Sequence, residues 1–178
     1  MDRLFVALAI PDAVARHLAL LQSGVPNARW QSREQLHLTL RFIGEVDGRD
    51  TATIDDALAM IDAPAFELAP HGVGEFGGKH PDALWAAVRP SEALTHLQRK
   101  VETAVQRAGQ KLDRQKYVPH ITLARLNRGT SPGRVIDWLT DHALFTAAPF
   151  AVTEFALYSS VLTDDGSIYR VERTYPLR

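Results

Sequence analysis

The segment Leu36-His-Leu-Thr-Leu40 recurs in the second half of the chain as Pro119-His-Ile-Thr-Leu123. Each copy contains a histidine, an apolar residue, a threonine and a second apolar residue. The separation between His37 and His120 is close to half of the 178-residue chain. One copy of so short a pattern would carry little weight, but two copies at corresponding places indicate a duplication. Alternation of apolar and polar residues predicts that each copy is a β-strand with one buried face.

Strand periodicity predicts where the side chains of these two segments point. In the first copy, His37, Thr39 and Arg41 share one face, and the leucines between them share the other. In the second copy, His120 and Thr122 share the polar face. We expect the apolar faces to pack on helices. Two imidazoles and two hydroxyls, related by an approximate two-fold axis, would then line one cleft.

This set of groups suits displacement at phosphorus. In-line attack needs a base on the attacking oxygen and an acid on the leaving oxygen, on opposite sides of the phosphorus. Imidazole titrates near pH 6.5, so one neutral and one protonated copy can coexist near neutrality. Each proton transfer contributes roughly 10²–10⁴-fold in rate, and hydroxyls can donate to the non-bridging oxygens. No carboxylate cluster accompanies the motifs to hold a metal, so we expect neither metal nor cofactor.

Around these segments, hydrophobic periodicity predicts a mixture of helices and strands. Helices are expected over 11–22, 50–61, 91–108 and 131–143, and strands over 4–10, 36–43, 66–76, 83–88, 121–126, 150–162 and 168–177. Short turns between strands, such as Thr163–Ser167, favour antiparallel sheets and an α+β fold over a parallel one. No low-complexity linker separates the halves, so residues 1–178 are expected to form a single domain.

Composition excludes several classes of protein. With 46% hydrophobic and 23% charged residues, the chain is globular, and without cysteine it has no disulfide scaffold, thiolate nucleophile or cysteine-ligated metal. Leu4–Ile10 is followed by Pro11–Asp12 where a cleavage site would be needed, so a buried strand fits better than a signal peptide. No apolar stretch approaches membrane-spanning length. We therefore expect a cytoplasmic protein, monomeric and without membrane contact.

Charge is unevenly distributed along the chain. The net charge is −1, but residues 45–82 contain nine acids and two bases, and residues 99–134 contain nine bases and two acids. Two interpretations stay open. These segments are either solvated faces of opposite sign, or the second forms a basic rim that attracts a phosphorylated ligand.

At the two His-x-Thr motifs the sequence resembles the 2H phosphoesterase superfamily, and within it the RNA 2′,3′-cyclic phosphodiesterases long described as 2′–5′ RNA ligases. The resemblance extends over Arg3–Leu8, His37–Glu45, Leu84–Trp85, Pro119–Arg125 and Tyr175–Leu177. It implies a bilobal α+β fold with two pseudo-symmetric antiparallel sheets facing a central cleft and helices on the outside. It also implies hydrolysis of a terminal 2′,3′-cyclic phosphate on RNA to a 2′-phosphate, with reversible 2′–5′ ligation in some members.

Carried over position by position, the resemblance implies catalytic roles for His37 and His120, and phosphate- or substrate-binding roles for Thr39, Thr122 and Arg125. In the resembled mechanism, His120 activates water and His37 protonates the leaving O3′. A pseudo-symmetric site can run in either direction, so this assignment stays open. Simple alternation places Arg125 on the face of the strand that points away from His120. The Arg125 side chain therefore reaches the cleft only if the strand ends or bulges near Ala124.

Two other functions remain compatible with the sequence. Small cyclic nucleotides and 2′–5′ oligoadenylate present the same phosphorus geometry, so a phosphodiesterase acting on them is an alternative. A non-catalytic nucleotide- or RNA-binding module is another, although intact His and Thr in both motifs argue against it.

Family members often carry Phe before the second Pro-His, whereas this chain has Lys116–Val118. We expect the nearby aromatic residues to pack in the core rather than stack on bases, namely Phe42, Trp85, Tyr117 and Tyr169.

Overall fold

The computed structural model, which describes residues 2–178, contains a helix or strand at each predicted place, but the strands predicted over 66–76 and 150–162 are each divided in two. The helices are α1 (Asp12–Ala19), α2 (Gly48–Ala59), α3 (Glu92–Arg107) and α4 (Pro132–His142). The strands are β1 (Asp2–Ala9), β2 (Arg29–Trp30), β3 (His37–Val46), β4 (Phe66–Leu68), β5 (Pro70–Phe76), β6 (Ala83–Val88), β7 (Ile121–Arg125), β8 (Phe150–Val152), β9 (Glu154–Thr163) and β10 (Gly166–Pro176). The structure adds β2 and a short 3₁₀ turn, η1 (Arg33–Gln35), which the periodicity did not indicate.

Local sequence explains where the helices begin. The side chain of Asp47 accepts a hydrogen bond from the Asp50 amide at the start of α2. Ser91 caps α3 and Ser131 caps α4 in the same way, and Pro132 occupies the first turn of α4. An N-cap oxygen satisfies one of the amides that lack a partner within the helix. These contacts involve neighbours in the sequence, which is why such helix starts are predictable.

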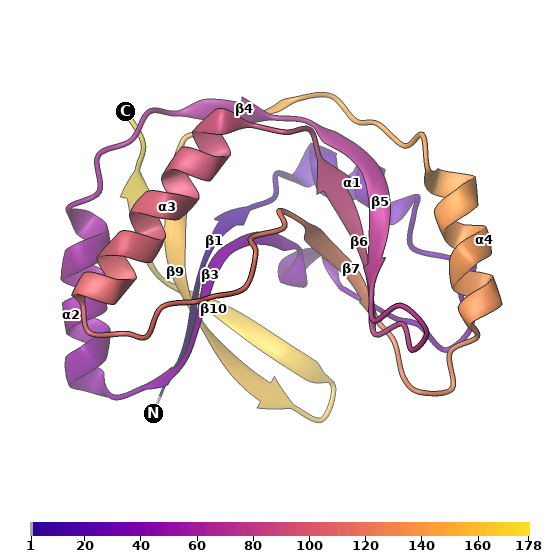
Figure 1. Ribbon diagram of the computed structural model, residues 1–178, viewed down its shortest axis with the longest axis horizontal. Helices are drawn as coiled ribbons and strands as arrows, with labels where there is room; N and C mark the ends of the chain where they lie inside the picture. The colour runs from indigo at the N-terminus through magenta and orange to yellow at the C-terminus, as the bar shows by residue number, and fades with distance from the viewer. Residues whose placement is uncertain (1) are drawn as a thin grey trace.

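The strands form an antiparallel sheet that divides into two halves. Its order is β10-β9-β1-β3-β7-β6-β5, with β2 paired to β7, and β4 and β8 form a separate pair. Within residues 2–178, the two halves of this sheet are joined between β3 and β7, through the registered pair of Leu38 with Ile121. On one side lie β10, β9, β1 and β3, and on the other β7, β6, β5 and β2 (Figure 1). The α+β fold with two antiparallel sheets that the sequence predicts is confirmed.

The duplication indicated by the two motifs extends through the chain. The order β1-α1-β3-α2-β4-β5 is repeated as β6-α3-β7-α4-β8-β9. Helices α2 and α4 begin at Gly48 and Pro132, and β4 and β8 begin at Phe66 and Phe150, so both pairs are offset by the same length of chain. Three elements have no counterpart in the repeat, namely β2, η1 and β10. The molecule is therefore a two-fold framework with additions in both halves of the sheet, β10 in one and β2 in the other.

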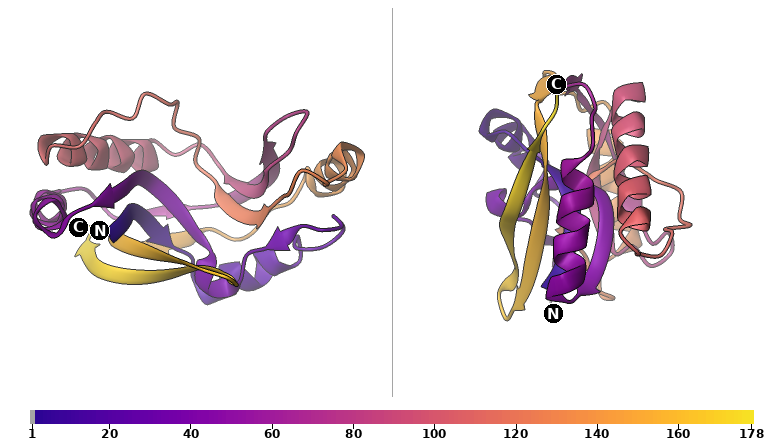
Figure 2. Two further views of the ribbon diagram at one scale, coloured as in Figure 1. Left: turned by 90° about the horizontal axis from the view of Figure 1, so that it is seen from below. Right: turned by 90° about the vertical axis from the view of Figure 1, so that its left-hand side faces the viewer.

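Each half of the chain contributes a helix to the opposite lobe. Helix α3 packs beside α2 against β3, where Gln98 Nε2 donates to the Leu40 carbonyl at 3.4 Å. After α1, the Leu21 carbonyl accepts from Trp138 Nε1 of α4 at 2.8 Å. Helices α2 and α3 thus lie together at one end of the molecule, and α4 lies at the other (Figures 1 and 2). This exchange interlocks the lobes.

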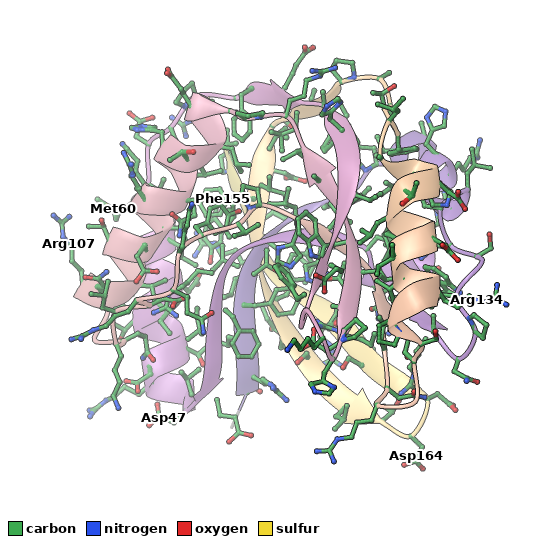
Figure 3. All side chains as sticks on the ribbon, turned by 45° about the vertical axis from the view of Figure 1, so that its right-hand side comes forward. Asp47, Met60, Arg107, Arg134, Phe155 and Asp164 are labelled. Atoms are coloured by element: carbon green, nitrogen blue, oxygen red, sulfur yellow. The ribbon has the colours of Figure 1, made fainter. Side chains whose placement is uncertain are left out.

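A single cluster of buried side chains runs through both lobes. Leu38 and Ile121, at the junction of the two sheet halves, are completely buried. Phe155 of β9 is among the largest buried side chains and stacks on Tyr175 of β10, with ring centroids 4.9 Å apart (Figure 3). None of the helices within residues 2–178 is both long and apolar enough to cross a membrane.

Candidate active site

The pairing of β3 with β7 brings the two motifs together. Because Leu38 lies opposite Ile121 in an antiparallel pair, His37 is directed toward Thr122, and His120 toward Thr39. Directly opposed side chains have Cβ atoms roughly 4.5–5.5 Å apart, and diagonal neighbours are about 7–8 Å apart. Since Leu38 and Ile121 point into the core, these four residues point into the cleft between the lobes. The two imidazoles are diagonal neighbours across the two-fold axis, a spacing that suits one tetrahedral anion between them.

Both imidazoles are held in the same orientation. His37 Nδ1 donates to the Gln35 carbonyl, and His120 Nδ1 donates to the Val118 carbonyl, each at 2.7 Å. A carbonyl oxygen only accepts, so each Nδ1 carries a proton and each Nε2 is left for another partner. Each acceptor lies at the same place relative to its histidine, at the second position before it in the chain. A neutral ring held in this way presents a basic Nε2, and a protonated ring presents a donor.

A β-bulge turns Arg125 into the cleft. The register of β7 against β6 shifts between Thr122 and Ala124, so Leu123 is an extra residue. Leu123 and Ala124 are consequently both buried, and Arg125 emerges on the side of Thr122. The positive charge of Arg125 lowers the pKa of both motif histidines, which places it within electrostatic range of them. The bulge that Arg125 needs to reach the cleft is therefore present.

The first motif carries an equivalent bulge, which corrects two predictions. Leu40 is an extra residue in the register of β3 against β1, so the residues after it exchange faces. Arg41 does not share the face of His37 as predicted, but is only 9% exposed and paired with Glu102 of α3. Phe42, predicted to pack in the core, is 47% exposed on the cleft side. Phe42 holds the same position relative to His37 as Arg125 does to His120, so the two-fold site has an aromatic ring on one side and a guanidinium on the other.

Aromatic side chains pack against both imidazoles. The edge of Tyr169 meets the His37 ring with centroids 5.1 Å apart. Phe76 meets His120 edge-on at 4.9 Å, and Trp85 is tilted against it at 5.7 Å. Such contacts fix the ring planes and exclude water from one face of each imidazole. Trp85 and Tyr169 are half-buried against the histidines and lie outside the core cluster, which corrects the core position predicted for them.

Tyr117 joins the segment before the second motif to the first motif. Its hydroxyl donates to the Thr39 carbonyl at 2.8 Å, and burial raises its pKa above the ordinary value. The packing role predicted for Tyr117 is confirmed.

Burial changes the protonation of both histidines. It is the main cause that lowers the pKa of His37 to about 4, and the charges of His120 and Arg125 lower it further. Burial, followed by Arg125, also lowers the pKa of His120. These shifts favour the neutral form of both rings at pH 7 in the free protein. An anion bound between the rings would raise both pKa values, because it stabilises imidazolium.

This pKa shift predicts that stability depends on pH. Unfolded His37 binds a proton near pH 6.5, whereas the folded side chain binds one only near pH 4. The unfolded state therefore holds more protons in this window, and the free energy of unfolding should fall as pH is lowered through it. The difference corresponds to roughly 3 kcal/mol from His37. Urea unfolding at pH 6.5 and pH 4 measures the total loss.

The His37 contribution is isolated by comparison with variants. His37→Gln should lose about 3 kcal/mol less than the wild type between the two pH values. His17→Gln, on the exposed face of α1, is the matched control and should keep the full loss. Equal losses in the His37 variant and the wild type would contradict the assignment.

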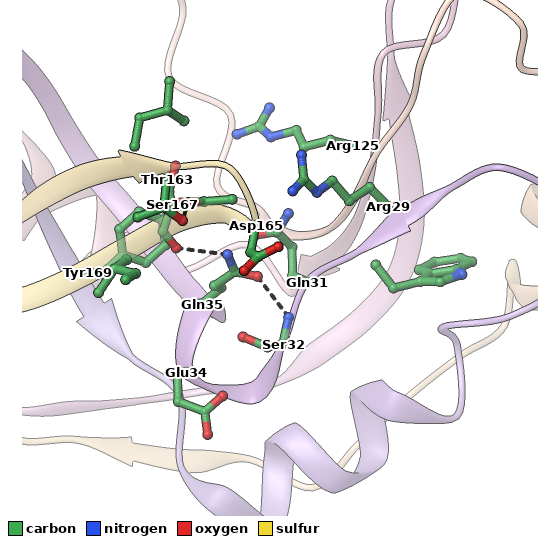
Figure 4. Close-up of a pocket in the computed structure, with 14 residues that line it drawn as sticks. Arg29, Gln31, Ser32, Glu34, Gln35, Arg125, Thr163, Asp165, Ser167 and Tyr169 are labelled. Atoms are coloured by element: carbon green, nitrogen blue, oxygen red, sulfur yellow. Dashed lines mark hydrogen bonds between the residues drawn. The ribbon is translucent and has the colours of Figure 1, made fainter.

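Two hollows lie at the candidate site, and only the second is lined by motif residues. One of about 800 Å³ is lined by Arg29, Gln35, Arg125 and Tyr169 (Figure 4). The other, of about 480 Å³, is lined by residues that include Thr39, Phe42, Tyr117 and His120. Arg29 is a residue that the sequence analysis missed, because it belongs to a strand too short to show periodicity. Among residues 2–178, no three or more His, Cys, Asp or Glu side chains are grouped so as to hold a metal ion.

Comparisons with known proteins agree with this geometry. Residues 10–164 match the model of the 2′-5′ RNA ligase superfamily. An RNA 2′,3′-cyclic phosphodiesterase of Geobacillus stearothermophilus is 33% identical over 167 residues, which cover 89% of this chain and 52% of that protein. One from Thermotoga maritima is 30% identical over 177 residues, which cover 95% of this chain and 92% of that protein. A crystal structure of Escherichia coli LigT complexed with 3′-AMP has a TM-score of 0.81 and 24% identity, covering 99% of this chain and 98% of that one.

Proposed function

Because this chain belongs to the 2′-5′ RNA ligase superfamily, we propose that it hydrolyses the terminal 2′,3′-cyclic phosphate of RNA to a 2′-phosphate by acid–base catalysis with two histidines. The curated relatives support the class of reaction, since they are RNA 2′,3′-cyclic phosphodiesterases. The observation that carries the proposal is the matched pair of Nδ1 hydrogen bonds at His37 and His120. They leave one Nε2 on each side of the position that a phosphate would take.

The reaction divides between the two rings. Following the resemblance, His120 Nε2 takes a proton from water as the water oxygen attacks phosphorus. The bond from phosphorus to O3′ breaks, and protonated His37 gives its proton to O3′. The product carries a 2′-phosphate and a free 3′-hydroxyl. Because the two rings are oriented alike, the direction is decided by how the substrate is seated.

The remaining motif residues bind the phosphate in this proposal. Thr39 and Thr122 lie opposite the two imidazoles and can donate to the non-bridging oxygens, where negative charge increases during attack. Arg125 adds a positive charge at the same place. The bound anion also allows His37 to be protonated, as the acid must be, because it raises the pKa of His37 above its value in the free protein.

The test is product analysis with an oligoribonucleotide that ends in a 2′,3′-cyclic phosphate, incubated in EDTA. We expect a 2′-phosphate terminus, because in this proposal the acid protonates O3′. A 3′-phosphate product would contradict the seating of the substrate. Inactivity in EDTA with activity restored by a divalent cation would contradict the metal-free mechanism.

We propose that the same site also catalyses 2′–5′ ligation, in which an RNA hydroxyl replaces water. If a 5′-hydroxyl of a second RNA replaces water as the nucleophile, attack on the cyclic phosphate forms a 2′–5′ linkage through the same proton transfers. We expect ligation to compete with hydrolysis as the concentration of 5′-hydroxyl RNA is raised. The joined product, resistant to a 3′–5′-specific ribonuclease at the junction, measures it.

A further inference from the structure

The larger hollow, which Gln35 and Tyr169 connect to His37, is lined mostly by segments that lie outside the duplication. It is formed by β2, η1 and the hairpin of β9 and β10, which extends from the body of the sheet with Asp164 at its tip (Figures 3 and 4). Neither β2, η1 nor β10 has a counterpart in the repeat. The duplicated elements place equivalent residues on both sides of the phosphate position. The additions are therefore what makes the two sides of the site different.

Two guanidinium groups share this hollow. Arg29 and Arg125 are directly opposed in the antiparallel pairing of β2 with β7, and Figure 4 shows both side chains on the same cavity. Like charges in opposed positions destabilise a sheet. No carboxylate forms an ion pair with either guanidinium in the described part of the chain. Arginine binds phosphate through paired hydrogen bonds, so the pair is suited to more than one anionic group.

The hairpin adds apolar surface next to these charges. Leu162 is 76% exposed and Ile168 is 61% exposed, and both line the hollow together with Tyr169. Gly166, at a φ of 116°, lies against Arg29, because a Cβ there would be 3.4 Å from Arg29 Nη2. Any larger residue would narrow the hollow at the guanidinium. Apolar and aromatic surface beside a positive charge is the combination that binds a nucleoside and its phosphate.

Gln35 connects this hollow to the catalytic pair. Its side-chain Nε2 donates to the Ser167 carbonyl of the hairpin at 2.9 Å (Figure 4). Its own carbonyl accepts the hydrogen bond from His37 Nδ1. The same residue therefore anchors the hairpin and orients the imidazole. This gives the hollow a fixed position relative to the reacting phosphate.

We propose that the hollow binds the nucleotide that precedes the cyclic-phosphate end, with Arg29 binding the phosphodiester that joins the two nucleotides. The inference rests on the proposed function and specifies its substrate class. The protein selects RNA chains over cyclic mononucleotides, because only a chain has a second phosphate and a second nucleoside to place there.

The test compares two substrates with the same reacting end, adenosine 2′,3′-cyclic phosphate and an oligoadenylate tetranucleotide ending in that group. We expect the wild-type kcat/KM to be roughly ten-fold or more higher for the tetranucleotide, and Arg29→Gln to reduce this preference about ten-fold. Arg29→Lys, which keeps the charge, should retain part of the preference. The matched control is Arg33→Gln, because Arg33 is paired with Asp12 at 2.7 Å and does not line the hollow.

Binding gives a second readout. For a tetranucleotide ending in a 2′-phosphate, Arg29→Gln should reduce the slope of log Kd against log salt concentration by about 0.7, as loss of one phosphate contact predicts. Arg29→Met, which keeps the aliphatic stem, serves if the glutamine variant does not fold.

The outcomes separate this inference from the proposed function. Equal wild-type kcat/KM values on the two substrates, or an equal loss on both in Arg29→Gln, would refute the chain-binding hollow and leave the phosphodiesterase activity standing. Hydrolysis of the tetranucleotide alone would be the strongest support. Inactivity on both substrates would instead refute the proposed function.

Discussion

Alanine at His37 or at His120 is expected to lower kcat for cyclic-phosphate hydrolysis roughly 10²–10⁴-fold. Each substitution removes one of the two proton transfers, while the other ring, Arg125 and the threonines remain to bind the phosphate. Single-turnover measurements at saturating RNA isolate this loss from changes in binding. Because the rings act together, the double variant should lose little more than the slower single variant. Full turnover by both single variants would falsify the acid–base roles.

A modified substrate distinguishes the acid from the base. Replacing O3′ by sulfur gives a leaving group that needs less protonation, so it should restore activity to the variant that lacks the acid and not to the one that lacks the base. The assignment made above predicts restoration in His37→Ala. Restoration in His120→Ala would reverse the two roles. His17→Ala, on the exposed face of α1, is the control for loss of a histidine elsewhere.

Glu102→Ala is expected to lower the free energy of unfolding by about 3–5 kcal/mol. The Arg41 guanidinium, 9% exposed, donates from Nε to Glu102 Oε2 at 2.5 Å and also reaches the carbonyls of Phe42 and Lys111. Glu102 Oε1 accepts from the Asp113 amide at 3.1 Å. Removing the carboxylate leaves a buried positive charge without its partner. Urea unfolding at pH 7 measures the loss.

A double variant separates two free energies: the net contribution of the ion pair to stability, and the penalty for leaving one buried charge without its partner. Replacing both partners, as Arg41→Met with Glu102→Leu, should recover much of the loss, because no charge is then buried alone. Glu92→Ala, on the exposed first turn of α3, is the control and should change stability by less than about 0.5 kcal/mol. A loss below about 1 kcal/mol in Glu102→Ala would indicate that water screens the pair.

The helices, most of the strands and the paired histidines of the candidate site could be predicted from the sequence. Their signals are local, since the period of apolar residues and the caps at Ser91 and Ser131 involve near neighbours in the chain. The paired motifs are also local, because each is a short run of adjacent residues. Recurrence of His-x-Thr in the second half of the chain indicated the duplication, and the alternation within each copy indicated which side chains face the cleft.

The two bulges show why alternation along a strand predicts the direction of a side chain over only a few residues. Alternation places Arg41 in the cleft and Phe42 in the core, and the extra residue at Leu40 reverses both. The extra residue at Leu123 likewise brings Arg125 to the cleft. A bulge depends on how a strand pairs with its neighbour, and β1 and β6 are remote in sequence from the residues they displace. No window along the chain contains that information.

The sequence by itself determined the four helices, most of the strands, the duplicated motif and the pair of imidazoles, because each is encoded by residues close together in the chain. Only the tertiary structure decided that α1 and α3 exchange lobes, that burial lowers the pKa of both histidines, and that Arg29 shares a hollow with Arg125. Each of these depends on the burial or proximity of groups that are distant in sequence. The distances in space between these groups are fixed only when the whole core packs.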